Sequence, residues 1–263
     1  VHAAAMMRQA IAPHIVKTRP GFFQAITPVR GSVVASPVLA SYDPEPDYFF
    51  HWFRDSAVVM DALRLVPDVV PDGPALFADF LHFSLDLQKL DGRGVPAPKA
   101  APDFTKFLRR NLAVAHGAAI AAETRVNPDG TLDISDWPRP QHDGPALRAL
   151  AILNWGVPGE DAARLLKSDL VFILSHARLS CFGVWEEEKG LHYYTLAVCA
   201  AALARGASWL AGQGESAAAA LCGEVGKELF AALEEWWLPD EGFIRAHILD
   251  VRRAEKELDI SVI

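Results

Sequence analysis

Two neighbouring stretches, LHYYTLAVCAAALARGASWLA (residues 191–211) and SAAAALCGEVGKELFAALEEWW (residues 216–237), decide the fold. Apolar residues recur in both with the period of an amphipathic helix. Almost no other part of the chain alternates between apolar and polar residues for long, as a half-buried strand would. The chain is therefore expected to be all-α.

The same helical period recurs between Pro and Gly pairs elsewhere in the chain. Further helices are predicted over residues 3–11, 56–66, 74–90, 104–123, 145–155 and 159–176. A regular succession of helix, loop and helix is what a barrel of helical hairpins would produce. No Pro/Ser-rich linker interrupts it, so we expect a single domain over residues 1–263.

Three segments are predicted to be non-helical: residues 22–53, where four prolines exclude a continuous helix and a short hairpin could form, residues 126–143, and residues 179–190. They hold most of the clustered Trp, Arg, Asp and Glu residues. Functional groups are commonly carried by loops on a rigid scaffold. A functional site is therefore expected on these three segments.

The composition restricts the class of protein. Apolar residues make up 51% and charged residues 22% of the 263 residues, which is typical of a globular protein. The net charge of -8, without a basic run among aromatics, argues against a nucleic-acid partner. The longest apolar run, residues 193–204, is shorter than the ~20 residues of a membrane span and is interpreted as a core helix.

The sequence gives little support for a cofactor, a metal site or a disulfide framework. Cys181, Cys199 and Cys222 are too scattered for a disulfide framework and are expected to be buried thiols. His51, His142 and His192 have no metal-binding spacing, so no metal is expected. No phosphate-binding loop, dinucleotide fingerprint or serine-nucleophile elbow is present, and no cofactor is expected.

The first candidate constellation is PDYFFHWFRD, residues 46–55. A carboxylate accepts hydrogen bonds from two sugar hydroxyls while a guanidinium donates to their oxygens, so Arg54 and Asp55 suit a sugar. The alternative is that Asp55 caps the following helix and Arg54 is its surface neighbour. The nearby rings of Tyr48, Phe50 and Trp52, on which a sugar face could stack, favour a site.

The second constellation is DWPRPQHDGPALRA, residues 136–149, where prolines on both sides of Arg139 stiffen the backbone. They would present Trp137 on a fixed loop, although Trp137 could equally fill the core.

The third constellation is FGVWEEEKG, residues 182–190. A carboxyl beside an indole loses hydration and gains proton affinity, which suits a glycosidase acid. The alternative is a solvated charge run.

In this order the three constellations resemble the glucoamylase family of glycoside hydrolases, family 15. The matching pieces are GSVVASP (31–37) with PDY (46–48) and WFRD (52–55), WPRPQHDGPALRA (137–149), and WEE (185–187) with Gly190 and Tyr194-Thr195. The resemblance implies an (α/α)6 barrel of the six-hairpin toroid type, incomplete in this chain. It also implies an inverting exo-hydrolase that releases glucose from the non-reducing end of α-glucans or oligosaccharides.

The resemblance assigns roles residue by residue. Glu186 would be the general acid and Glu187 a neighbouring substrate ligand. Arg54 and Asp55 would hold hydroxyls of the terminal glucose. The aromatic lining of the pocket would comprise Tyr48, Trp52, Trp137 and Trp185. The general base of the family would follow Ile263.

The chain departs from the family pattern at two places. Gly183 stands where the family commonly has Asp ahead of the acid, and the segment from Asn127 to Trp137 is short. A partial barrel would also expose one apolar flank, which the remainder of the barrel or a partner chain is expected to cover.

Two other readings compete with the hydrolase. One is a non-hydrolytic carbohydrate-binding or regulatory module on the same scaffold, as in the glucoamylase-like regulatory subunits of phosphorylase kinase. The other is a structural helical repeat protein, which leaves the three constellations unexplained. Linkage specificity (α-1,4, α-1,6 or α,α-1,1) and localisation, in the cytoplasm or after export, stay open.

Overall fold

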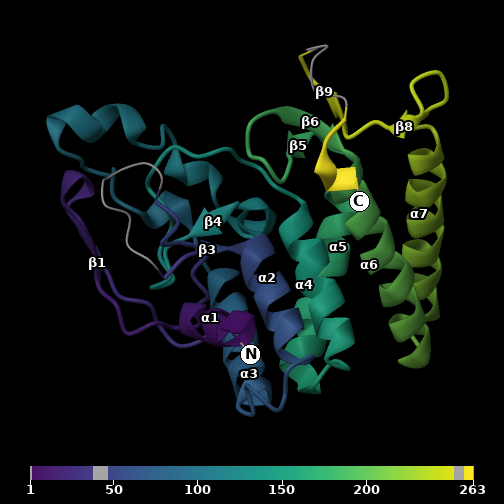
Figure 1. Cartoon of the computed structure of the whole chain (residues 1–263), viewed down its shortest axis with the longest axis horizontal. Helices are drawn as coiled ribbons and strands as arrows, with labels where there is room; N and C mark the ends of the chain where they lie inside the picture. Colours follow the sequence, from purple (N-terminus) through teal and green to yellow (C-terminus); the bar gives the residue numbers. More distant parts are fainter. Residues whose placement is uncertain (1, 38–46, 252–257, 263) are drawn as a thin grey trace. The chain divides into compact units, whose positions relative to one another are not determined.

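The computed structural model describes residues 2–37, 47–251 and 258–262, and Figure 1 traces the whole chain. The chain divides into two compact units, Val1–Trp137 and Pro138–Ile263. Helices are the main elements of both units, as expected. Strands are two to four residues long.

In the first unit the α-helices of the described part are α1 (His2–Ala10), α2 (Phe53–Leu63) and α3 (Gly73–Leu87). Strands β1 (Lys17–Arg19) and β2 (Gln24–Ile26) form an antiparallel hairpin. The short hairpin expected within residues 22–53 thus lies partly ahead of that range. Residues 38–46 of the same range are outside the described residues.

A second antiparallel pair joins distant parts of the first unit. Strand β3 (His51–Trp52) pairs with β4 (Arg125–Val126), so that His51 faces Val126 and Trp52 faces Arg125. Adjacent residues of a strand point to opposite faces. His51 therefore enters the core, where its ring contacts Phe53, Phe80 and Phe83, while Trp52 lies on the other face with Arg125.

The predicted helix over residues 104–123 is wrong. The segment forms three separate 3₁₀ helices instead: η3 (Pro102–Phe107), η4 (Leu112–Val114) and η5 (Gly117–Ala122). The Asn111 side chain accepts a hydrogen bond from the Ala113 N–H, a local bond that competes with a helix. Gly117 has a φ of +56°, and Leu112 and Ile120 pack in a small cluster with Leu132. Tertiary packing and local side-chain bonds override the helical pattern here.

The second unit contains α4 (Asp143–Asn154), α5 (Gly159–His176), α6 (Tyr193–Gly212) and α7 (Ser216–Glu234). Helix α6 contacts α4, α5 and α7. At Gly206 of α6 a side chain would lie 2.6 Å from Leu170 of α5, so glycine permits this close helix contact. A buried ion pair between Arg148 and Asp169, with N–O distances of 2.7 and 2.9 Å, links α4 to α5.

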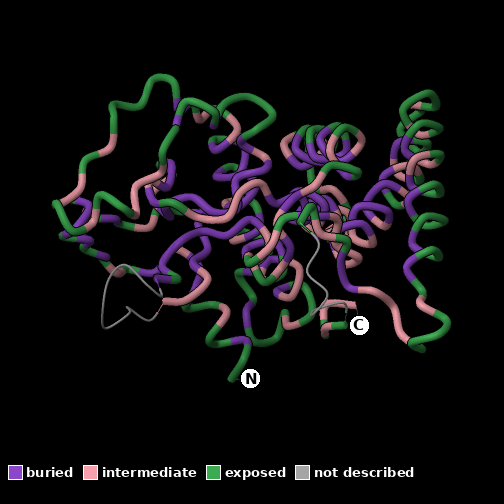
Figure 2. The backbone as a smooth tube through the Cα atoms, turned by 90° about the horizontal axis from the view of Figure 1, so that it is seen from above, coloured by how far each residue is buried: buried purple, intermediate pink, exposed green. Residues whose placement is uncertain are grey.

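Helix α6 is long and apolar enough to cross a membrane by length and composition. One such helix is weak evidence, because the core helix of a folded protein passes the same test. Its contacts with three helices identify α6 as the central helix of its unit. Helix α7 buries a stripe of Cys222, Gly226, Leu229 and Leu233. Figure 2 shows buried and exposed backbone along this helix, at the right-hand edge of the view.

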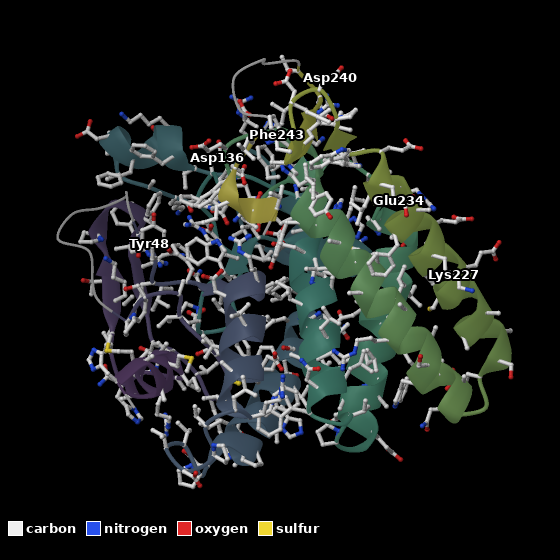
Figure 3. The ribbon with its side chains drawn as sticks, turned by 45° about the vertical axis from the view of Figure 1, so that its right-hand side comes forward. Tyr48, Asp136, Lys227, Glu234, Asp240 and Phe243 are labelled. Atoms are coloured by element: carbon white, nitrogen blue, oxygen red, sulfur yellow. The ribbon has the colours of Figure 1, made fainter. Side chains whose placement is uncertain are left out.

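The opposite side of α7 mixes charged and apolar side chains. Lys227 and Glu234 are exposed there (Figure 3), and Leu221 and Phe230 are each about half exposed. Coverage of this flank by further chain or by a partner stays a prediction.

Short strands complete the second unit. Strands β5 (Cys181–Phe182), β6 (Lys189–His192) and β9 (His247–Leu249) form an antiparallel sheet in the order β5-β6-β9. Strands β7 (Trp237–Leu238) and β8 (Phe243–Ile244) pair separately, and η6 (Ile260–Val262) follows. All three cysteines are buried thiols, as predicted.

Candidate functional site

The first unit gathers the predicted aromatic residues around β3. The ring of Trp52 lies 5.8 Å from that of Tyr48 and 5.9 Å from that of Trp137, measured between centroids. Trp52 is 3% exposed, whereas Tyr48 is 49% exposed and Trp137 is partly exposed. Tyr48 and Trp137 therefore present ring surface to solvent, and the buried ring of Trp52 contacts both rings.

Arg54 and Asp55 lie in the first turn of α2. Trp52 is the N-cap residue, so Asp55 lies inside the first turn of the helix and is not its N-cap residue. The Arg54 Nε lies 3.6 Å from an Asp55 carboxylate oxygen. Both residues line a cavity of about 500 Å³, together with Met6, Met7, Val34–Pro37, Val58 and Val59. The pair thus borders an open space large enough for a sugar ring.

The candidate acid lies in the loop between β5 and β6. Pairing of Cys181 with Gly190 and of Phe182 with Lys189 closes the hairpin that carries this loop. Glu186 adopts a φ of +59°, a conformation that non-glycine residues seldom adopt, and its N–H donates to the Gly183 carbonyl at 3.0 Å. Strained backbone of this kind is found preferentially at functional sites.

A buried glutamine from the second constellation holds the Glu186 carboxyl group. The Gln141 amide Nε2 donates to Glu186 Oε1 at 3.0 Å and to the Gly183 carbonyl at 3.2 Å. The Phe182 N–H also donates to the Pro140 carbonyl at 2.9 Å. Gln141 is 3% exposed. The residues just before α4 therefore hold both the backbone of the acid loop and its carboxyl group.

The departure at Gly183 has a structural explanation. A Cβ atom at this position would lie 2.5 Å from Nδ1 of His192, so the imidazole occupies the space of a side chain. The His192 Nε2 lies 3.1 Å from the Cys181 carbonyl oxygen, which fixes the ring. Burial lowers the pKa of His192, so the ring is neutral at neutral pH. His192 thus fills the position that a larger residue at 183 would occupy.

The acid loop opens on a cavity of about 320 Å³. Its lining comprises Gly183–Glu188, His192, Tyr194, His247, Leu258, Asp259 and Ser261. The predicted residues Trp185, Glu186 and Glu187 thus border one space, with Trp185 58% exposed and Glu187 also exposed.

Asp259 is an anionic member of this cavity that sequence reasoning missed. Burial alone would raise the pKa of Asp259, but hydrogen bonds from Ser261 and from the Trp185 indole, with the charge of His247, lower it overall. The Ser261 N–H donates to Asp259 Oδ1 at 2.6 Å. Asp259 thus adds a carboxylate to the cavity that Trp185 and Glu186 also line.

Two further residues were missed for different reasons. Gln141 lies within the quoted second motif, but nothing local shows that its amide reaches a carboxyl 45 positions later. Arg125 lies far from Trp52 in the sequence and is brought beside it by the β3–β4 pairing. In the described part of the chain, no cluster of three His, Cys, Asp or Glu residues is arranged to hold a metal ion.

The chain is similar to known glycoside hydrolases in sequence and in fold. The family model of glycosyl hydrolases family 15 matches residues 14–68 and 120–263, which together make up most of the chain. A probable glucoamylase of Schizosaccharomyces pombe is 29% identical over 228 residues, covering 82% of this chain and 46% of the relative. The intracellular sporulation-specific glucoamylase of Saccharomyces cerevisiae is 30% identical over 206 residues, covering 71% and 33%.

Solved structures show the same fold. The Hypocrea jecorina family 15 glucoamylase superposes with a TM-score of 0.67 at 23% identity, over 85% of this chain and 35% of that chain. The Saccharomycopsis fibuligera glucoamylase gives 0.69 at 22% identity, over 92% and 50%. The fold is thus the all-α (α/α)6 barrel.

The chain spans a third to a half of the length of the two curated relatives described above, so it covers part of that barrel. The three quoted motifs fall within the segments that the family model matches. On the combined evidence of motifs, fold and family match, the chain belongs to glycosyl hydrolases family 15.

Proposed function

We propose that the protein is an inverting, exo-acting α-glucoside hydrolase that releases glucose from the non-reducing end of an α-glucan or a related oligosaccharide. The observation that carries the proposal is the hydrogen bond from buried Gln141 to the Glu186 carboxyl at the edge of a 320 Å³ cavity. Family membership and the glucoamylases among its relatives support the same conclusion.

Glu186 is proposed as the general acid. Because the Gln141 amide donates to Oε1, that oxygen acts as an acceptor and the acidic proton is carried by Oε2. The proton passes from Oε2 to the glycosidic oxygen as the bond to the anomeric carbon breaks. The indole of Trp185 and the carboxylate of Glu187 line the same cavity, where they are placed to bind the sugar.

The terminal glucose is proposed to bind the residues of the first constellation. Asp55 would accept hydrogen bonds from its hydroxyls and Arg54 would donate to their oxygens. Tyr48 and Trp137 would stack on the sugar face, with Trp52 behind them. Hydrogen bonds to hydroxyls that strengthen as the sugar ring distorts would lower the barrier as well as bind the substrate.

Inversion also needs a base about 6.5–9.5 Å from the acid, which activates a water on the opposite face of the sugar. This base is a second carboxylate, separate from Glu186 and from the sugar-binding residues named above. Comparison of maltose, isomaltose and trehalose as substrates distinguishes a preference for α-1,4, α-1,6 or α,α-1,1 bonds.

The test is glucose release from maltose, isomaltose and trehalose by the full-length protein, with the product anomer followed by NMR. β-Glucose as the first product is expected. The Glu186→Gln variant should lose turnover yet keep sugar binding, because the acid acts in the transition state. Binding without hydrolysis by the unsubstituted protein would instead indicate the regulatory module, and unchanged turnover in Glu186→Gln would refute the assignment.

A further inference from the structure

Two arginines and two aromatic rings of the first unit form a continuous stack. The Arg19 guanidinium lies 3.9 Å from the centre of the Phe50 ring, and the Arg125 guanidinium also lies 3.9 Å from it. Arg125 lies only 3.6 Å from the centre of a Trp137 ring. We name this group, Arg19, Phe50, Arg125 and Trp137, the guanidinium stack.

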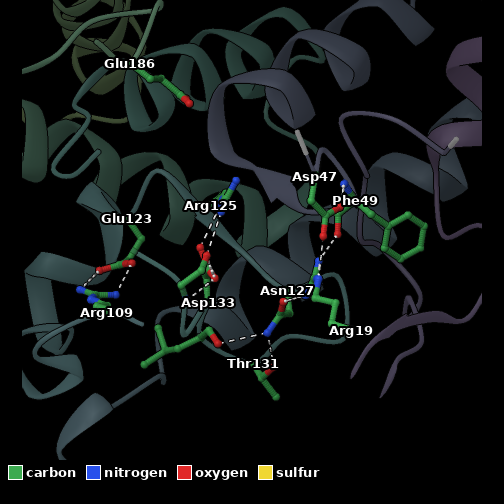
Figure 4. Close-up of polar contacts among 12 residues, drawn as sticks. Arg19, Asp47, Phe49, Arg109, Glu123, Arg125, Asn127, Thr131, Asp133 and Glu186 are labelled. Atoms are coloured by element: carbon green, nitrogen blue, oxygen red, sulfur yellow. Dashed lines mark hydrogen bonds and ion pairs between the residues drawn. The ribbon is translucent and has the colours of Figure 1, made fainter. Parts of the chain in front are cut away.

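Both guanidinium groups are held by buried hydrogen bonds (Figure 4). Arg19 donates to Asp47 at 2.8 Å, to Asn127 at 2.7 Å and to the Phe49 carbonyl at 2.9 Å. Because Arg19 is 2% exposed, this end of the stack is fixed within the protein interior.

Arg125 is held equally firmly and is 3% exposed. It donates to Asp133 and to the Ser135 hydroxyl, both at 2.9 Å. The other oxygen of Asp133 accepts from the Ser135 N–H and Oγ at 2.8 and 2.6 Å. A guanidinium with its edge fixed in this way has little freedom to tilt, so the plane of its face is set.

The outer end of the stack is a ring that reaches solvent. Trp137 is partly exposed, whereas Phe50 is 3% exposed. Trp137 also meets Trp52 edge to face, at 5.9 Å and 82°, and Arg125 lies 4.9 Å from the Trp52 ring. Buried ion pairs are weak evidence for stability by themselves. Here the fixed cation lies against a ring that reaches the surface.

We propose that Arg125 is a positioning residue that sets the plane of Trp137, so that this ring offers a preformed stacking face to a sugar. The inference rests on the proposed function in assigning the sugar, but the orientation of the ring does not depend on hydrolysis. A preformed face avoids the entropic cost of ordering an indole on binding. Arg125 need not touch the substrate to have this effect.

The chain offers a matched control. Arg109 forms a partly buried bidentate ion pair with Glu123, both distances being 2.8 Å, in the same unit. No cation–ring contact involving Arg109 is found among the described residues. Arg125→Met and Arg109→Met each remove one guanidinium that is paired with a carboxylate, the Arg125 side chain being 3% exposed and that of Arg109 9%. Only the first removes a cation from an aromatic face.

The experiment uses the full-length protein and maltose. We expect Arg125→Met to raise KM about tenfold, equal to about 1.4 kcal/mol, since stacking contributes to ground-state and transition-state binding alike. The kcat should fall by less than about threefold. The near-UV circular dichroism of the Trp52–Trp137 pair should change. Arg109→Met should change neither KM nor the spectrum, although its stability falls.

Arg125→Lys keeps the charge but lacks the planar face, so its KM should stay raised. This variant also tests the proposal if Arg125→Met does not fold. In a Trp137→Phe background, Arg125→Lys should add little to KM, because the two residues act through one ring. Equal KM and spectra in Arg125→Lys and the unsubstituted protein, or equal effects of the Arg125 and Arg109 variants, would overturn the proposal.

Failure of the proposed function would be distinguishable. If the unsubstituted protein hydrolyses no glucoside, titration with maltose by calorimetry still measures the affinity of each variant. The spectrum reports the ring orientation without any substrate.

Discussion

Replacing Gln141 with leucine tests the contact on which the candidate acid depends. The change keeps the approximate size of the side chain and removes the amide that donates to Glu186 Oε1 at 3.0 Å. It also leaves the Gly183 carbonyl without that donor. Because the rest of the cavity is unaltered, the expected defect lies in the chemical step and not in sugar binding.

The magnitude follows from the geometry. As Glu186 gives up its proton in the transition state its carboxyl group becomes charged, and a hydrogen bond to a charged group contributes about 1.5–3 kcal/mol. Each 1.36 kcal/mol lost from the transition state lowers the rate about tenfold, so kcat for maltose should fall about ten- to a hundredfold. The KM should change by less than about threefold, because the hydroxyl contacts are made elsewhere. Steady-state kinetics of the full-length protein measures both constants.

Ser180→Ala is the matched control. The Ser180 hydroxyl donates to Asp250 at 2.6 Å beside the same hairpin, so this variant also removes a hydrogen bond to a carboxylate, but one that does not contact Glu186. Its kcat should be unchanged. A Gln141→Leu enzyme with kcat within about threefold of the unsubstituted protein would refute the reasoning, as would an equal loss in Ser180→Ala.

Two further predictions concern stability. Burial and the neighbouring charge of His176 lower the pKa of His142 from 6.5 to about 4, so the folded protein binds this proton less readily than the unfolded chain. The contribution of His142 to stability is therefore complete above pH 6.5 and is lost as the pH drops through 4, about 3 kcal/mol in total. Between pH 7 and 4.5, urea unfolding should show a smaller loss of unfolding free energy for His142→Gln than for the unsubstituted protein. An equal loss in the two proteins would contradict this cause. Gly183→Ala should cost about 1–3 kcal/mol, because the new methyl group meets the His192 ring at 2.5 Å. Most of that cost should vanish in a His192→Ala background, and a cost that persists there would exclude the collision.

The sequence by itself determined the helical architecture and the family. Periodicity placed the helix over residues 159–176 with the bounds that α5 has, because helical spacing is a local property of the chain. It placed α6 within two residues at its start, and it singled out all three constellations. Local pattern was most misleading over residues 104–123, where Asn111 and Gly117 interrupt the helix and Leu112 and Ile120 pack in the small core cluster. It also carried the helix over residues 216–237 past the end of α7, into β7.

Only the tertiary structure decided which residues act together. Gln141 reaches Glu186 across 45 positions because the backbone before α4 lies against the acid hairpin. Arg125 meets Trp52 and Trp137 because β4 pairs with β3, more than 70 positions earlier. His192 explains Gly183 because β6, which carries His192, pairs with β5, which ends one residue before Gly183. Hydrophobic periodicity records which face of an element is buried, whereas the partner of a polar side chain is set by how distant segments pack, and no local pattern contains that information.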